Sequence, residues 1–262
     1  MDERNQENKS FVLKMSKYFE DSGINPQNFN CKYINECRFE KEKQYAHGMQ
    51  CHIGYQYGNE YENRPIPKLV IISLDCGNGG AKIIEERIKD VRKSCVERAD
   101  VHMDGKVVHM DGKTVKIPGT NDCARLILGM EDCPMIADYY AMTNACKCCH
   151  MDNANHMRNT FYKKCSEYKL GEINILNPEI ILAQSVSSMM YYGLEDKLLK
   201  IDGVSESIKK YLFIYQNEGH KSYLIKSFHP SCRGRHTRRM IEYYSRIFPH
   251  IVEYIKTHPI GI

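Results

Sequence analysis

Three polar side chains that can do chemistry follow apolar runs at distant points of the chain. Asp75 comes after the run 69–72, Asn144 after 135–142, and His229 after 222–227. A carboxylate can activate water or stabilise a cation, an imidazole can stabilise a developing anion, and an amide can both donate and accept hydrogen bonds. The structural alternatives are a turn or helix-cap aspartate and a strand-end histidine bonded to backbone.

The elements around these residues predict where they meet. Leu69 to Ile72 is an unbroken apolar run, which indicates a strand buried on both faces, and Gly77, Gly79 and Gly80 lead into a helix over 81–98. Further strands are expected at 135–142, 179–182 and 222–227, and helices at 11–21, 121–128, 156–170, 186–192 and 237–255. This alternation predicts a three-layer α/β/α sandwich with a central four-stranded parallel sheet. Ligands bind at the carboxyl ends of such strands, so the three side chains should share one edge.

Length and composition indicate one domain over residues 1–262, with 1–67 as an N-terminal helix and a cysteine-bearing segment. The net charge of only +4 excludes an argument for nucleic-acid binding from overall charge. The polar start and the lack of a long apolar run predict a cytoplasmic monomer without a membrane partner. In that compartment the twelve cysteines argue for core thiols or metal ligands rather than disulfides.

A short repeat interrupts the pattern, because 101–106 (Val-His-Met-Asp-Gly-Lys) recurs at 108–113. Each copy carries an Asp-Gly turn signal, which predicts a hairpin-like insert over 99–117. The two His-Met-Asp sets have the side chains of metal ligands. We favour a local tandem duplication in a surface insert over a metal site.

Several motifs resemble the uracil-DNA glycosylase superfamily, most closely its iron–sulfur branches, over residues 31–239. They are His229-Pro230-Ser231 after the last expected strand, Thr143-Asn144-Ala145-Cys146-Lys147-Cys148, Cys165 ahead of Pro178, and Glu62-Asn-Arg-Pro-Ile-Pro67. The resemblance implies that superfamily's sandwich fold and a 4Fe–4S cluster held by Cys31, Cys37, Cys148 and Cys165. In the family this cluster is structural.

The cysteine spacing departs from the family pattern. Five residues separate Cys31 from Cys37, where the family usually has two. Cys51 is therefore a rival for one ligand position, and Cys146 or Cys149 is a rival for that of Cys148. A tetrahedral zinc ion and buried free thiols are the alternatives to a cluster.

The resemblance also implies residue roles. Asp75, in Ser73-Leu-Asp-Cys-Gly77, matches a water-activating aspartate that cluster-bearing branches usually lack, and Cys76 replaces the usual proline. His229 would stabilise the departing base, while Asn144, Leu74 and Ile117 would contact it. Ile117 stands where the family has a stacking ring, for which Tyr57 or Tyr61 would have to substitute.

The basic run 233–239 connects the His229 motif to the last helix. Clustered arginines at a helix start bind phosphate, so Ser231, Arg233, Arg235 and Arg239 are expected to contact the DNA backbone. The alternative is a solvated charged face.

Together these features predict a monofunctional DNA glycosylase that flips a base out of DNA and hydrolyses its N-glycosidic bond, leaving an abasic site. The altered pocket suggests a modified base such as glucosylated hydroxymethylcytosine, and hence anti-phage defence. The alternatives are a non-catalytic iron–sulfur nucleic-acid-binding protein and a nucleoside or nucleotide hydrolase.

Overall fold

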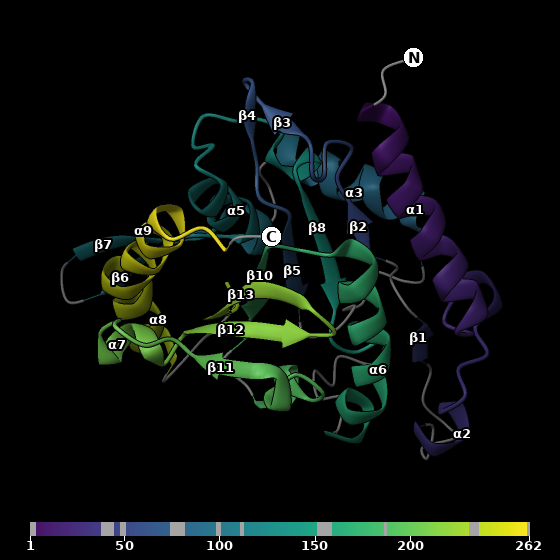
Figure 1. Cartoon of the computed structure of the whole chain (residues 1–262). Helices are drawn as coiled ribbons and strands as arrows, with labels where there is room; N and C mark the ends of the chain where they lie inside the picture. Colours follow the sequence, from purple (N-terminus) through teal and green to yellow (C-terminus); the bar gives the residue numbers. More distant parts are fainter. Residues whose placement is uncertain are drawn as a thin grey trace.

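A seven-stranded mixed sheet forms the centre of the computed structural model, which describes residues 4–37, 45–47, 51–73, 82–97, 101–110, 113–150, 159–185, 188–230 and 236–260 (Figure 1). The strand order is β11-β12-β13-β10-β5-β8-β2. The bounds are β2 (His52–Ile53), β5 (Leu69–Ser73), β8 (Tyr140–Asn144), β10 (Ile180–Gln184), β11 (Leu198–Lys200), β12 (Leu212–Asn217) and β13 (His220–Ser227).

The expected α/β class is confirmed, but the expected strand number is wrong. The four predicted strands β13, β10, β5 and β8 are neighbours and run parallel. Antiparallel β12 pairs with β13 and carries β11, while β2 pairs antiparallel with β8 on the other side. The β12–β13 hairpin turns at Glu218 (φ 48°) and Gly219 (φ 84°). Because glutamate rarely adopts positive φ, the sequence gives only a weak turn signal there.

The middle strands end in register at one edge of the sheet. Ser73 of β5 pairs with Asn144 of β8, and Gln184 of β10 pairs with Ser227 of β13. All five residues of β8 and of β10 are buried, as expected for strands covered on both faces. We call the row formed by the carboxyl ends of β5, β8, β10 and β13 the strand-end edge.

Helices cover both faces of the sheet (Figure 1). Phe19 of α1 (Arg4–Asp21) and Ile173 of α6 (Asn159–Leu176) share an apolar core with Ile72. The opposite core joins Ile71 to α5 (Thr120–Leu128) and α9 (Phe248–Thr257), and α3 (Ile84–Glu97) contacts β2. A Cβ on Gly171 of α6 would lie 2.2 Å from the Tyr18 hydroxyl, so only glycine permits this close approach of α1 and α6.

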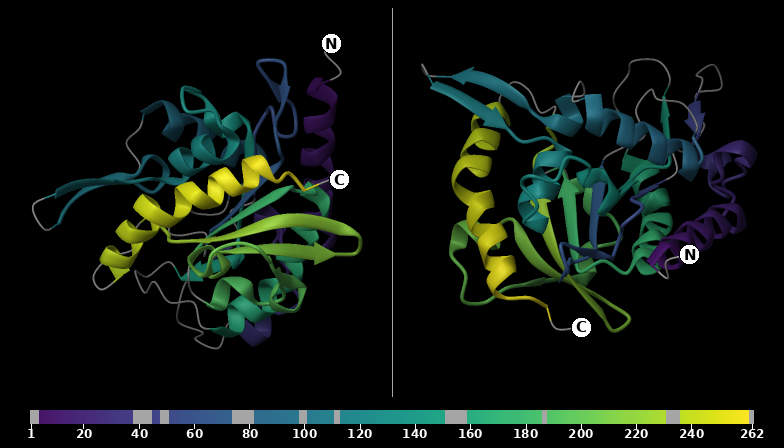
Figure 2. Two further views of the ribbon diagram at one scale, coloured as in Figure 1. Left: turned by 60° about the vertical axis from the view of Figure 1, so that its left-hand side comes forward. Right: turned by 90° about the horizontal axis from the view of Figure 1, so that it is seen from above.

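The repeat forms an arm that projects from the body (Figure 2). It consists of α4 (Val101–Asp104), β6 (Lys106–Met110) and β7 (Lys113–Ile117), so the expected hairpin is confirmed. The two copies nevertheless differ. Val-His-Met is helical at 101–103 and extended at 108–110, because only the second copy has a partner strand. Position in the fold, rather than the tripeptide, decides its conformation.

Three expected elements differ in extent. The strand predicted from residue 135 begins at Tyr140, after a 3-10 turn at Ile136–Asp138. The helix expected over 186–192 is, in its described part, a 3-10 turn at Ser188–Tyr191. The C-terminal helix is divided into α8 (His236–Glu242), a π-helical turn (Tyr243–Ile247) and α9. Pro249 explains the break, since it has no N–H to bond the carbonyl one turn back.

The smaller described elements are α2 (Ile34–Cys37), α7 (Glu206–Lys209), β1 (Tyr45–His47), which pairs with β9 (Cys148–His150), and the hairpin of β3 (Glu60–Tyr61) and β4 (Arg64–Pro65). Among the described helices, none has both the length and the apolar character needed to cross a bilayer.

Candidate functional site

The strand-end edge collects the predicted reactive segments. Asn144 is 5% exposed and closes β8 beside Ser73, and the N–H of Ala145 donates to the Ser73 carbonyl at 2.8 Å. Asp75 follows Ser73 by two residues, and half-buried His229 follows the end of β13 by two residues. The edge therefore joins Asn144 to the strand that leads to Asp75, with β10 between that strand and the one that leads to His229.

The remaining predicted residues have different outcomes. Asp75, Leu74, Ser231, Arg233 and Arg235 lie outside the described residues. Arg239 is exposed on α8. Ile117 is fully buried in the apolar core, at the end of β7.

Neither tyrosine considered as a substitute ring lies at the strand-end edge. The Tyr57 hydroxyl donates to the Leu176 carbonyl at 3.0 Å, just ahead of β10, and its ring packs against Phe11. Tyr61 packs on Tyr139, the residue that precedes β8, with ring centroids 5.4 Å apart. Both contacts are at the amino ends of the strands, so these rings are on the wrong side of the sheet to stack on a base at the strand-end edge.

Gln184 is a polar residue of this edge that sequence reasoning missed. It ends β10, is fully buried, and its Oε1 accepts from the Thr120 hydroxyl at 2.9 Å. Its Nε2 has no hydrogen-bond partner in the described structure. Buried donors are nearly always paired, so an unpaired one at a strand end is available to a ligand. The apolar run Ile-Ile-Leu-Ala just before Gln184 was the available signal.

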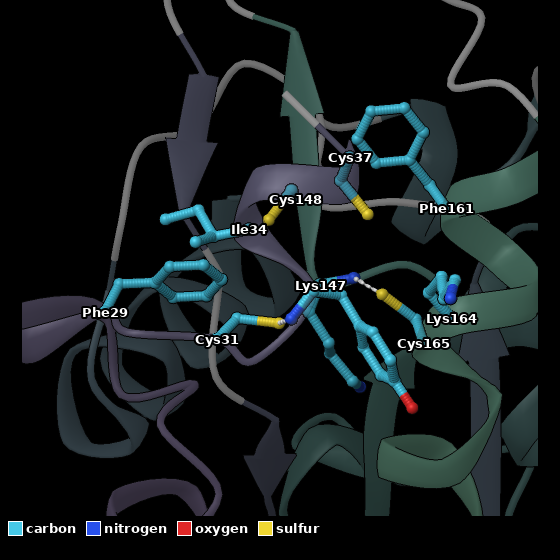
Figure 3. A pocket seen from close by; sticks show the side chains of 10 residues that line it. Phe29, Cys31, Ile34, Cys37, Lys147, Cys148, Phe161, Lys164 and Cys165 are labelled. Atoms are coloured by element: carbon cyan, nitrogen blue, oxygen red, sulfur yellow. Dashed lines mark hydrogen bonds between the residues drawn. The ribbon is translucent and has the colours of Figure 1, made fainter. Parts of the chain in front are cut away.

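The four predicted cluster cysteines line one pocket (Figure 3). Cys31 precedes α2, Cys37 ends it, Cys148 begins β9 and Cys165 belongs to α6. Cys31, Cys37 and Cys165 are buried, and Cys148 is half-buried. Phe29, Ile34 and Phe161 complete the apolar lining. We call this space the thiol pocket.

The local fold explains the unusual spacing of the first two cysteines. The four-residue helix α2 lies between Cys31 and the end of this segment at Cys37, and it turns the chain so that both thiols line the same pocket. Cys51, the rival ligand, is buried in the core but does not line the pocket. Cys146 is fully buried behind it and donates to the Cys148 carbonyl at 3.1 Å. The side chain of Cys149 lies outside the described part.

The environment treats the thiols differently. Burial, together with the nearby Cys165 and Cys31, raises the pKa of Cys37 to about 11. The pKa of Cys165 is lowered, first by the side-chain interaction with the neighbouring Cys146 thiol and also because the Lys147 N–H, 3.4 Å away, donates to its Sγ. Hydrogen bonds of this kind stabilise the thiolate, which is the form that binds metals.

A buried ion pair fixes the segment between the strand-end edge and the thiol pocket. Lys147, 4% exposed, donates from Nζ to both carboxylate oxygens of fully buried Glu172, at 2.6 and 2.7 Å. It also donates to the Asn144 carbonyl at 2.7 Å, and the Thr143 hydroxyl donates to Glu172. The lysine of the Thr-Asn-x-x-Lys-Cys motif thus fixes Asn144 to Glu172 of α6 and also lines the thiol pocket.

The four thiols are the donor set of a 4Fe–4S cluster and also that of a tetrahedral zinc ion. Within the described ranges, no three or more His, Cys, Asp or Glu side chains are grouped to hold one metal ion. Zinc needs its ligands around one point, whereas each thiolate of a cluster binds a different iron. The empty space in the pocket is about 380 Å³ including its open part.

No family model matches the chain, and a search of the curated proteins found no match.

Proposed function

We propose that this protein is a DNA glycosylase that carries a structural 4Fe–4S cluster and hydrolyses the N-glycosidic bond of a flipped, modified base. One observation carries the proposal. Four cysteines selected from sequence motifs line a single pocket, and Lys147 joins that pocket to the strand end that bears Asn144. Chance core thiols have no reason to gather where the motif predicts a ligand set.

The residues at the strand-end edge, and those that follow it in the sequence, offer groups of the kinds that the reaction needs. Cleavage of an N-glycosidic bond builds positive charge on the sugar and negative charge on the leaving base. In this mechanism the Asp75 carboxylate orients water and stabilises the cation, and His229 stabilises the anion of the base. Asn144 and the unpaired Nε2 of Gln184 read the polar edge of the flipped base.

Cys31, Cys37, Cys148 and Cys165 would hold the cluster, which supplies cross-links between distant segments rather than electrons. Its ligands come from α2, β9 and α6, so a bound cluster would tie the N-terminal segment to the motif that ends in Cys148. Metal binding of this kind contributes directly to folding.

Buried apolar Ile117 at the position of the family's stacking ring supports a pocket remodelled for a base other than uracil. We assign glucosylated hydroxymethylcytosine as the first substrate to test, with anti-phage defence as the biological role. Because the net charge is small, substrate choice should depend on this pocket rather than on bulk attraction to DNA.

The test is mass spectrometry of bases released from DNA by the iron-loaded protein. Substrates are unmodified DNA, uracil-containing DNA and phage DNA with glucosylated hydroxymethylcytosine. The proposal expects one free base and matching abasic sites, and no release from free nucleosides or nucleotides. Release from monomers alone would identify a nucleotide hydrolase, and DNA binding without release from any substrate would contradict catalysis.

A further inference from the structure

The strands that sequence reasoning missed build a second pocket beside the strand-end edge. It is lined by residues of β11, β12, β13 and α8, which lie together in Figure 1. Its empty space is about 1160 Å³ including the open mouth. We call it the basic groove, and its cations are Lys200, Lys210, Lys226 and Arg239.

The cations of the basic groove make no close ion pair among the described residues, although Glu195 acts on Lys226 and Glu206 acts on Lys200 and Lys210 at longer range. In the described part of the chain, none of the four forms an ion pair, and Glu195 is the only carboxylate among the lining residues. The lysines just outside behave differently: Lys209 is paired with Glu206 at 2.8 Å and Lys197 with Asp196 at 3.1 Å. Unpaired cations around a concave surface favour a polyanion over water.

Three aromatic rings lie among these cations. The Lys226 ammonium is 4.3 Å from the centroid of the Tyr191 ring and 4.4 Å from that of Phe213. Tyr211 packs on Tyr243 with centroids 4.7 Å apart. Tyr191 is buried, whereas Tyr211 and Phe213 are only partly buried and keep exposed ring surface in the groove. Cations with partly exposed rings are how proteins hold single nucleic-acid strands, by phosphate contact and base stacking.

The groove also adjoins the proposed reaction site. The Tyr191 hydroxyl donates at 2.7 Å to the carbonyl of Ser185, which follows β10 directly. The ring of Tyr211 packs against Phe228, the residue before His229, at 6.5 Å between centroids. Tyr191 thus connects the groove to the end of β10, where Gln184 lies, and Tyr211 connects it to the end of β13, just ahead of His229.

We propose that the basic groove binds a nucleotide of the DNA strand that flanks the target base, with its phosphates on Lys200, Lys210 and Arg239 and its base against Phe213. This inference rests on the proposed function for the identity of the polymer. The stacking surface separates it from a simple phosphate site, because phosphate alone has no use for the rings.

The first measurement is the affinity for a short fluorescein-labelled single-stranded DNA as a function of salt. Lys200→Ala and Lys210→Ala should each weaken binding and reduce the slope of log Kd against log salt by about 0.7, the value for one lost phosphate contact. Lys197→Ala and Lys209→Ala are matched controls, since these neighbouring lysines are already paired. Equal slopes for all four variants and the wild type would overturn the groove assignment.

The second measurement tests the rings. Phe213→Leu removes the stacking surface and should weaken binding of base-bearing DNA roughly fivefold or more, while the affinity for an abasic strand of the same length stays unchanged. An equal loss on both strands, or none on either, contradicts base stacking. Strong binding of inorganic polyphosphate with no response to Phe213→Leu identifies a plain anion site and also contradicts it.

These measurements are independent of catalysis. If the groove variants show a smaller slope of log Kd against log salt, but the wild type releases no base from any DNA, the glycosylase proposal is rejected and the proposed DNA contact in the groove is kept. Base release with unchanged slopes would reject the groove and keep the glycosylase.

Discussion

The thiol pocket and the strand-end edge lie at the two ends of one short segment, yet they are built in opposite ways. In the thiol pocket the buried charge is paired locally: Lys147 is paired with Glu172, and the Cys165 sulfur accepts from the Lys147 N–H. At the strand-end edge Gln184 keeps an unpaired buried donor, and the adjoining basic groove keeps unpaired cations. The first arrangement suits a permanent structural group, and the second suits a ligand that comes and goes.

The largest effect is expected in the thiol pocket, when a proposed cluster ligand is removed. Cys148→Ser and Cys165→Ser should lose nearly all bound iron and much of the folding yield, because the cluster contributes folding free energy. Cys51→Ser should keep both, since Cys51 does not line the pocket. Metal analysis after anaerobic purification measures this, with about four irons per chain expected in the wild type. One zinc per chain and no iron would contradict the cluster, as would iron loss in Cys51→Ser alone.

The buried ion pair comes next. Lys147→Met leaves the buried Glu172 carboxylate without its cation, with only the Thr143 hydroxyl, among the described residues, donating to it, and should lower the free energy of unfolding by about 3–5 kcal/mol. Lys147→Met combined with Glu172→Leu should recover most of that loss, because no unpaired charge remains. Lys209→Ala, which breaks an exposed pair, should cost less than about 1 kcal/mol. Denaturant unfolding measures all three. Equal losses in Lys147→Met and the double variant would contradict the role of the charge.

The third prediction concerns how the free energy of unfolding depends on pH through a buried histidine of the sheet. His52 of β2 is fully buried, its Nε2 lies 2.7 Å from the Ala137 carbonyl, and burial lowers its pKa to about 3. Between pH 6.5 and 3 the unfolded chain therefore binds a proton that the folded chain does not. As the pH is lowered from 6.5 to 3, the free energy of unfolding should therefore decrease, by at most about 1.4 kcal/mol per pH unit from this group.

The control for this effect is a neutral replacement. His52→Asn cannot titrate and should show a flatter loss of stability between pH 6.5 and 4 than the wild type. His250→Asn, at an exposed position of α9, should follow the wild type. Parallel curves for the wild type and His52→Asn would contradict the assignment.

The smallest effect is expected at the strand-end edge, on the rate of base release. Gln184→Met keeps the volume of the side chain and removes the unpaired Nε2 donor. Folding stability should fall by only about 1 kcal/mol, because the substitution also removes the Oε1 acceptor of the Thr120 hydroxyl, while single-turnover base release by the folded protein should slow roughly fivefold, the value of one hydrogen bond from Nε2. Gln216→Met, at an exposed position of β12, is the matched control. Unchanged release by Gln184→Met would remove this residue from the site.

Sequence patterns predicted the parts of the fold that follow from local composition. The four parallel strands are apolar runs, and all four were predicted as strands even where the observed ends differ from the predicted ones. Strand β11 was missed because it has three residues and is partly exposed, and strand β12 because it is partly exposed and the tight turn at Glu218 departs from the usual residue preferences. The repeat shows the limit most directly, since one tripeptide forms both helix and strand.

The candidate site divides in the same way. The family resemblance implied the four cysteines that line the thiol pocket, because a ligand set is recorded in residue type, although the spacing of Cys31 and Cys37 departs from the family pattern. Gln184 and the basic groove depend on packing between distant elements, which no local pattern records. The two tyrosines considered as stacking rings illustrate the reverse error, since both lie at the amino ends of the strands.

The most direct test of the account is a double-mutant cycle on base release. Asp75→Asn and His229→Ala should each slow single-turnover release by about 100-fold or more while leaving DNA affinity largely intact, as expected for groups that act in the transition state. If both act on one transition state, the double variant should lose less than the product of the two single losses. Near-wild-type release by Asp75→Asn would contradict the assigned mechanism, and near-wild-type release by both single variants would move the active site away from the strand-end edge.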